Sequence, residues 1–228
     1  MNIEFFTTGD GSHSLYLPDL DEHYHSIHGA ARESRHVYIK NGLHYFLSQH
    51  SPFNETVHIL EYGFGTGLNA LSTYEYMLNN RVNVNFTTLE KYPLPQSIIE
   101  KLNHTEYFDF EGAKKLFSDL HRLSVNESHE LSDRFTLLKL DRDFQSFWSE
   151  PSTVHVIYFD AFAPNVQPEF WTVEMFKKLR EQLKPGGVLV TYSSKGTVRR
   201  NMLAAGFKTE KLPGPPGKRE MLRGGKED

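Results

Sequence analysis

The chain has 228 residues, of which 38% are hydrophobic and 24% charged, values that are ordinary for one globular domain with a full core. It contains no cysteine, which excludes disulfides and thiolate zinc sites. No apolar run approaches the roughly 20 residues that span a bilayer, and the first residues lack the basic-then-apolar order of a signal peptide. We therefore expect a cytoplasmic protein with no membrane partner.

The charge is unevenly distributed along the chain. The net charge of −4 argues against a general nucleic-acid binder. From Thr191 to Asp228, however, nine Lys and Arg accompany four Asp and Glu, so this segment is basic and the rest of the chain is acidic. Such a segment is either an ordinary solvated surface or a face that binds a phosphate backbone.

The first half of the chain becomes regular only after residue 56. Residues 1–30 predict short strand-like pieces, and residues 37–47 (VYIKNGLHYFL) predict a strand, a turn and the start of a helix. We expect a buried strand at 57–63, an amphipathic helix at 69–80 and a second strand at 83–90. The prolines of KYPLP delay the next helix until about Ser97.

The second half continues the alternation of strands and helices. We expect an irregular helical stretch at 97–132, strands at 135–140, 154–162 and 188–194, helices at 172–183 and 198–206, and a closing strand pair at 207–212 and 218–224. This order predicts an α/β fold, a Rossmann-like mostly parallel sheet with an antiparallel C-terminal strand pair. Without repeats or linkers, residues 1–228 should form a single domain.

Three glycines at every second position follow the first regular strand, in EYGFGTGLN at residues 61–69. A dinucleotide loop reads GxGxxG and holds a pyrophosphate, which the carboxylate of Glu61 would repel. A sulfonium or ammonium cation would be attracted to it, and small residues let the backbone approach an uncharged ribose. The loop therefore favours S-adenosyl-L-methionine as the cofactor over NAD. The cofactor-binding residues predicted in it are Glu61, Gly63, Gly65, Thr66, Gly67 and Asn69.

Acidic residues also end the next two strands. Glu90 closes the second strand about 20 residues past the loop, where an acid accepts hydrogen bonds from ribose hydroxyls. Asp141 and Asp143 follow the third strand, and either is placed to accept from an adenine amino group. Because a ligand sits beyond the carboxyl ends of parallel strands, these acids should meet around one cofactor.

Several motifs together carry a resemblance to a known family. EYGFGTGLN, TLEKYPL, DAFAPNVQPEFW and KGTVRRNMLAAGF…PGKREMLRG resemble the methyltransferase domain of the bifunctional tRNA 5-methylaminomethyl-2-thiouridine biosynthesis proteins, the MnmC family. The similarity runs from about Glu33 to Gly224. It implies a class I methyltransferase that uses S-adenosyl-L-methionine to methylate the primary amine of 5-aminomethyluridine at the tRNA wobble position.

The chain departs from that family in two ways. The bifunctional proteins continue into a FAD-dependent oxidase domain, so this chain is expected to be a stand-alone methyltransferase, with a separate oxidase acting on the same nucleotide. The family usually reads Lys-Asn-Pro in the DAFAP segment, where this chain has Val166-Gln167-Pro168. The missing lysine leaves open how this loop holds the nucleotide.

Amine methylation requires a neutral nitrogen, whereas an alkylamine with a pKa near 10.4 is mostly protonated at neutral pH. Asp160, at the end of the fourth strand, is the candidate catalytic residue, either as a base or as a group that only orients the amine. Phe162 is placed to stack on the base of the nucleotide, and Pro164 to stiffen the protein loop after the fourth strand. Phosphates could bind Lys195, Arg199, Arg200, Lys218 and Arg219.

The N-terminal residues 1–50 are expected to form an extension over the cofactor side, with Tyr24, His25 and Ser26 closing over the cofactor. The spacing His23-x-His25-x-x-His28 resembles a metal site, but without cysteine or an ordered acid pair we expect no metal. Two other functions stay open. One is methyl or aminopropyl transfer to a small free amine, and the other is a non-catalytic module that binds RNA or protein.

Overall fold

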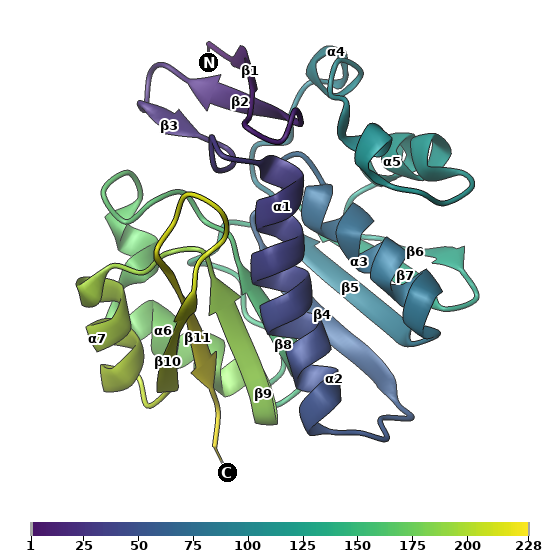
Figure 1. The fold of residues 1–228 in the computed structure, drawn as a ribbon. Helices are drawn as coiled ribbons and strands as arrows, with labels where there is room; N and C mark the ends of the chain where they lie inside the picture. The colour runs from purple at the N-terminus through teal and green to yellow at the C-terminus, as the bar shows by residue number, and fades with distance from the viewer. Residues whose placement is uncertain (1, 228) are drawn as a thin grey trace.

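The computed structural model describes residues 2–227 and is built around one large sheet (Figure 1). The eight strands lie in the order β10-β11-β9-β8-β4-β5-β7-β6. They are β4 (Thr56–Tyr62), β5 (Asn83–Leu89), β6 (Ser128–Ser132), β7 (Phe135–Leu140), β8 (Val154–Phe159), β9 (Leu183–Thr191), β10 (Lys208–Pro213) and β11 (Glu220–Gly225). The central five strands pair in parallel, and β10, β11 and β6 pair antiparallel. The predicted fold class is therefore confirmed.

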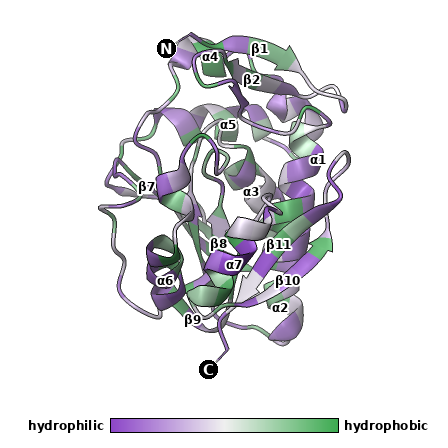
Figure 2. Ribbon diagram, turned by 90° about the vertical axis from the view of Figure 1, so that its left-hand side faces the viewer, coloured by the Kyte–Doolittle hydropathy of each residue, from purple (hydrophilic) through white to green (hydrophobic). Residues whose placement is uncertain are grey.

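Helices cover both faces of this sheet. They are α1 (Ala30–Ser34), η1 (Arg35–His44), α2 (Tyr45–Gln49), α3 (Leu68–Asn80), α4 (Gln96–Ile99), η2 (His104–Tyr107), α5 (Ala113–Arg122), η3 (Pro168–Trp171), α6 (Val173–Gln182) and α7 (Gly196–Ala204). One hydrophobic core joins η1, α3 and α5 to the sheet, and a second joins α6 and α7 to it. In Figure 2, α6 carries both hydrophilic and hydrophobic segments, as expected for a helix with one face on a core.

Two predicted segments differ from the structure. The stretch 97–132 is predicted to be helical and irregular, but its end forms β6, a mostly polar edge strand that has no hydrophobic period to reveal it. Residues 37–47 were expected to contain a strand and a turn, but they lie within one uninterrupted helical run from Ala30 to Gln49. Ten residues of that run, η1, have π-helical hydrogen bonding.

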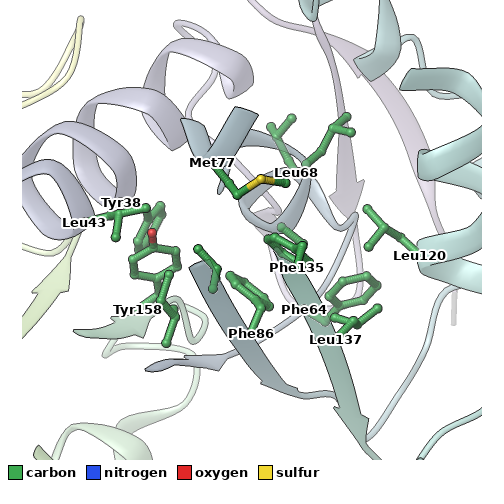
Figure 3. Packing of buried hydrophobic residues seen from close by; sticks show 14 of the residues in the cluster. Tyr38, Leu43, Phe64, Leu68, Met77, Phe86, Leu120, Phe135, Leu137 and Tyr158 are labelled. Atoms are coloured by element: carbon green, nitrogen blue, oxygen red, sulfur yellow. The ribbon is translucent and has the colours of Figure 1, made fainter. Parts of the chain in front are cut away.

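Gly42 explains why the predicted turn does not form. It lies on the face of η1 that packs on the sheet, where a Cβ would come within 2.9 Å of Val190 Cγ2 and 3.3 Å of the Tyr158 ring. The glycine therefore allows a close helix–sheet approach. Figure 3 shows the neighbouring contacts, with Tyr38 and Leu43 lying beside Tyr158.

Gly42→Ala should lower the free energy of unfolding by up to about 2 kcal/mol. Overpacking costs about 1–3 kcal/mol, and alanine regains roughly 1 kcal/mol of helix propensity. Chemical denaturation would measure the change. In a Val190→Ala background the same substitution should cost much less, and an equal cost there would contradict this packing argument.

A second, three-stranded sheet precedes the long helical run. It consists of β1 (Glu4–Thr7), β2 (His13–Leu17) and β3 (Glu22–His23), in that order. Figure 1 shows it beyond the end of the large sheet at which α3 begins, which is the carboxyl end of the parallel strands. Within residues 2–227, no helix has the length and apolar character needed to cross a membrane.

Candidate active site

A cavity of about 560 Å³ lies at the carboxyl ends of β4, β5 and β8. Its wall is formed by the glycine loop after β4, the tips of β5 and β8, the segment 20–28 and the loop between β10 and β11. The wall is acidic. Its carboxylates are Glu22, Glu33, Glu90, Asp143 and Asp160, and its lysines are Lys91 and Lys218.

The glycine loop holds its shape through backbone conformations that other residues rarely adopt. Gly63, Gly65 and Gly67 have φ angles of 101°, 51° and 73°. A Cβ on Gly63 would lie 2.6 Å from the backbone oxygen of Asp160, so the tips of β4 and β8 touch directly. A Cβ on Gly65 would lie 3.2 Å from Tyr24 of the N-terminal segment. The backbone of the loop thus lines the cavity and packs closely against Asp160 and Tyr24.

Glu90 is in the position predicted for it, at the tip of β5 and on the cavity wall. Its Oε2 accepts a hydrogen bond from the Gly65 amide at 3.0 Å, and its Oε1 accepts one from the Tyr92 amide at 2.7 Å. Burial raises the pKa of this carboxyl. Each oxygen keeps a second lone pair, so the carboxylate can still accept from a ribose hydroxyl.

Asp141 and Asp143 have different surroundings. Asp143 lies on the cavity wall, and its Oδ1 accepts a hydrogen bond from the Gln145 amide at 2.8 Å. Asp141 does not line the cavity, and its carboxylate lies 3.4 Å from the Lys91 ammonium on the surface. Of the two residues that the sequence left open, the geometry favours Asp143.

Glu61 lies behind the glycine loop rather than on the cavity wall. It is fully buried, and its Oε2 accepts a hydrogen bond from the Thr88 hydroxyl at 2.6 Å. Its Oε1 has no hydrogen-bond partner among the described residues. Burial raises the pKa of Glu61 well above its usual range. A direct contact with a cofactor cation would need this side chain to reach the cavity.

Asp160 is held by two donors at the tip of β8. The Tyr38 hydroxyl donates to Oδ1 at 2.5 Å, and the Asn69 amide donates to Oδ2 at 2.8 Å. The Ser34 hydroxyl in turn donates to Asn69 Oδ1 at 2.7 Å, which fixes the orientation of that amide. Burial raises the pKa of Asp160 to about 7, although the bond from Tyr38 opposes this. Asp160 can therefore exchange a proton near neutral pH.

Lys218 lies inside the cavity rather than on an outer RNA-binding face. Its ammonium is 2.6 Å from Glu33 Oε1 and 4.3 Å from the centre of the Tyr192 ring. The backbone at Gly217 packs against the His28 ring. The β10–β11 loop and the N-terminal segment thus both contribute to the cavity wall, and Figure 1 shows these two chain segments near the same end of the large sheet.

The other predicted RNA-binding cations do not line the cavity. Lys195 donates to Asn165 Oδ1 at 2.9 Å, and Arg199 is half-buried with its Nε unpaired among the described residues. Arg200 and Arg219 are exposed. Their role in binding phosphate stays a prediction.

The loop after β8 is stabilised by Gln167. This residue follows Val166, which occupies the position of the lysine in the family pattern. Gln167 Oε1 accepts from the Phe162 amide at 3.2 Å, and the Trp171 indole donates to the Phe162 carbonyl at 2.9 Å. Phe162 lines the cavity and packs edge-to-face on Tyr24, whereas Pro164 lies outside the wall. The loop therefore presents one aromatic ring to the cavity.

Comparison with known proteins identifies the class of enzyme to which the chain is similar. Residues 120–227 match the protein family described as S-adenosyl-L-methionine-dependent methyltransferase. This match and the relatives described below identify an S-adenosyl-L-methionine-dependent methyltransferase. The enzyme class and the cofactor predicted from the glycine loop are therefore confirmed.

This methyltransferase is also similar to longer proteins. It is 33% identical over 214 residues to the tRNA 5-methylaminomethyl-2-thiouridine biosynthesis bifunctional protein MnmC of Leptospira interrogans, covering 92% of the chain and 33% of that protein. It is 32% identical over 225 residues to the MnmC of Aeromonas salmonicida, with the same two coverages of 92% and 33%. The methyltransferase thus spans about a third of the length of these relatives.

Solved structures show the same fold. MnmC2 from Aquifex aeolicus superposes with a TM-score of 0.76 at 24% identity, covering 98% of the methyltransferase and 69% of that chain. A probable spermidine synthase from Corynebacterium glutamicum superposes with a TM-score of 0.53 at 18% identity, covering 98% and 76%. The resemblance of the methyltransferase to the MnmC methyltransferase domain is confirmed.

Two residues of the site were not predicted from the sequence: Glu33 lines the cavity, and Tyr38 donates to Asp160 from behind the wall. Tyr38 was placed in a strand, and Glu33 carried no motif beyond the start of the family resemblance. Both residues belong to the long helical run from Ala30 to Gln49, which was not predicted because Gly42 is typical of a turn. Tyr24, His25 and Ser26 do line the cavity, and His25 contacts the hydroxyl of Thr66 at 3.2 Å.

Proposed function

We propose that this chain transfers a methyl group to the aminomethyl nitrogen of 5-aminomethyluridine, with or without 2-thiolation, at the wobble position of tRNA. The acidic cavity with Asp160 at its centre is the observation that carries the proposal, because it suits an amine and repels phosphate. The similarity of more than nine-tenths of the chain to tRNA-modifying MnmC proteins supports the choice of nucleotide. A cytoplasmic location follows if tRNA is the substrate.

The residues of the cavity fit the cofactor. Gly63 and Gly65 leave backbone room beside the tip of β4, Glu90 would accept from the ribose hydroxyls, and Asp143 would accept from the adenine amino group. Thr66, Gly67 and Asn69 would complete the loop, and Glu61 would support it from behind through its hydrogen bond with Thr88. When bound, S-adenosyl-L-methionine supplies an electrophilic methyl group on its sulfonium.

Asp160 performs the proton chemistry. An alkylamine such as that of lysine has a pKa near 10.4, so the substrate amine arrives mostly protonated. With a pKa of about 7, ionised Asp160 can pair with the ammonium and hold the nitrogen after the proton leaves. Desolvation in the cavity would lower the pKa of the amine and the ionised carboxylate would raise it, so transfer of the proton to Asp160 supplies the neutral nucleophile. Orientation and proton acceptance are both available to the same carboxylate.

The nucleotide would enter from the loop side. Phe162 would stack on the base, with Pro164 and Gln167 holding the loop after β8. Lys195, Arg199, Arg200 and Arg219 would bind phosphates around the anticodon loop, and Lys218 would act at the cavity mouth. Residues 1–228 would work as a single domain with residues 1–50 over the cofactor. A separate oxidase would act on the same nucleotide.

Labelled S-adenosyl-L-methionine tests the proposal directly. The protein is incubated with bulk tRNA that carries unmethylated aminomethyluridine, with tRNA already methylated there, and with a set of polyamines. Label should enter only the first. Label in polyamines alone would replace the proposal by transfer to a small free amine, and no label in any acceptor would leave the fold with a binding role only.

A further inference from the structure

Asp160 receives a hydrogen bond from a residue that does not reach the cavity. The Tyr38 hydroxyl donates to Asp160 Oδ1, yet Tyr38 is only 2% exposed and is absent from the cavity wall. It therefore cannot touch a substrate in this arrangement. Whatever it contributes to catalysis must act through the carboxylate.

The fold places that hydroxyl through two fixed points. Gly42 seats η1 against Val190 and Tyr158, four residues after Tyr38 on the same helical run. From the neighbouring strand of the same sheet, Arg223 of β11, which pairs with Val190, donates to the Asn41 carbonyl at 3.2 Å and stacks on the Tyr45 ring. Segments of π-helix occur frequently at functional sites. Here the wide turns hold one side chain at the tip of β8.

Packing alone does not require the hydroxyl. The Tyr38 ring lies 5.2 Å from the Tyr158 ring, within the hydrophobic core that Figure 3 shows, and a phenylalanine would fill the same space. The oxygen is nevertheless buried and needs a partner, and Asp160 provides it. The second donor, Asn69, is itself fixed by Ser34. Two independent elements thus hold the two oxygens of one carboxylate.

We propose that Tyr38 is a positioning residue for methyl transfer, whose hydroxyl fixes the rotation of the Asp160 carboxylate and favours its ionised form. This inference rests on the proposed role of Asp160 in binding the substrate amine. Ionised carboxylates gain most from donors inside a dry site, because a charge-assisted hydrogen bond is roughly twice as strong as a neutral one. Charges of Glu33 and Lys218 also act on Asp160, and they oppose each other.

Tyr38→Phe is the test. Loss of the donor should raise the pKa of Asp160, so the acid limb of the kcat/KM profile should move by about one pH unit to higher pH. The rate ratio of wild type to variant, in which the ionisation of the amine cancels, should be about tenfold at pH 6 and close to one at pH 9.5. Affinity for S-adenosyl-L-methionine should not change. Tyr158→Phe, which removes a neighbouring buried hydroxyl that does not bind Asp160, should leave the profile unmoved.

A rate ratio that is constant with pH, or a loss of cofactor affinity, would show that Tyr38 only supports packing. Titration of the Asp160 carboxyl carbon by NMR needs no substrate. It separates this inference from the proposed function. If the pKa rises in Tyr38→Phe while tRNA is not methylated, the positioning stands and the substrate assignment fails. If the pKa does not move, Tyr38 has no such role whatever the substrate.

Discussion

Asp160→Asn should lower the turnover of methyl transfer by about 10²–10⁴-fold, the usual range for loss of a general base. The substituted side chain cannot accept the proton of the ammonium, and it carries no charge to attract the amine. Affinity for S-adenosyl-L-methionine should stay within about twofold, because Glu90 and the glycine loop remain in place. Single-turnover kinetics with saturating cofactor would measure the first effect, and calorimetry the second.

Asp143→Asn is the matched control for that experiment. Asp143 lies on the same wall, but we assign it to the cofactor. Its loss should weaken cofactor binding and leave single-turnover rates at saturation nearly unchanged. If Asp160→Asn instead weakens cofactor binding and turns over normally at saturation, the two roles are reversed. The thermal stability of both variants should also be measured. An asparagine at position 160 would place its own NH₂ group near the Tyr38 hydroxyl or the Asn69 amide, both of which are donors.

The buried histidines should lower the stability of this protein between about pH 6.5 and pH 4, whereas the raised pKa values of Glu61, Glu90 and Asp160 act in the opposite direction. Burial lowers the pKa of His25 and of His121 to about 4, and that of His104 well below its ordinary value near 6.5. Between pH 6.5 and the lowered pKa of each histidine, that imidazole ring is protonated in the unfolded chain and neutral in the folded protein. The histidine contribution to the free energy of unfolding therefore falls as pH falls, by about 1.4 kcal/mol per pH unit for each histidine. Urea denaturation at a series of pH values would measure the slope.

His104→Phe isolates one member of this group. Both ring nitrogens of His104 are buried without a hydrogen-bond partner among the described residues, and the ring packs edge-to-face on Phe117. The charged groups that act on it are His25, His121 and His13. Phenylalanine should raise stability at every pH below 6.5 and reduce the slope by about 1.4 kcal/mol per pH unit. An unchanged slope would place the acid sensitivity elsewhere.

The same histidines couple acid stability to the cofactor loop. The His121 ring donates to the Thr66 carbonyl at 3.1 Å, and His25 contacts the Thr66 hydroxyl. Protonation of His25 in the folded state would need its ring to turn or leave the core. We therefore expect cofactor affinity to decline over the pH range in which unfolding becomes easier.

Much of the fold was predictable from periodicity and turn chemistry. The strands of the parallel sheet are buried apolar runs, and a glycine or a carboxylate ends each of the first four. Those ends also carry most of the site, so Glu90, Asp143 and Asp160 could be placed before any coordinates. Their convergence follows from parallel strands having their carboxyl ends at one edge.

The rest depended on contacts between distant segments, which leave no local signal. Gly42 resembles a turn residue in sequence, and only the nearness of Val190 shows that it serves a helix. Lys218 resembles a surface charge, and only Glu33 shows that it lies in the cavity. Glu61 was correctly placed at a strand end, but burial behind the loop depends on how tightly the tips of β4 and β8 meet.

Closure of the cavity has a consequence for synthesis of the chain. Glu33 and Lys218 are 185 residues apart in sequence, and Gly217 packs against His28 at the same place. While the ribosome is still making the last hairpin, the glycine loop and the strand tips exist without their final wall. Capture of the cofactor must therefore wait until the C-terminal strands have left the exit tunnel, and nascent chains should remain empty.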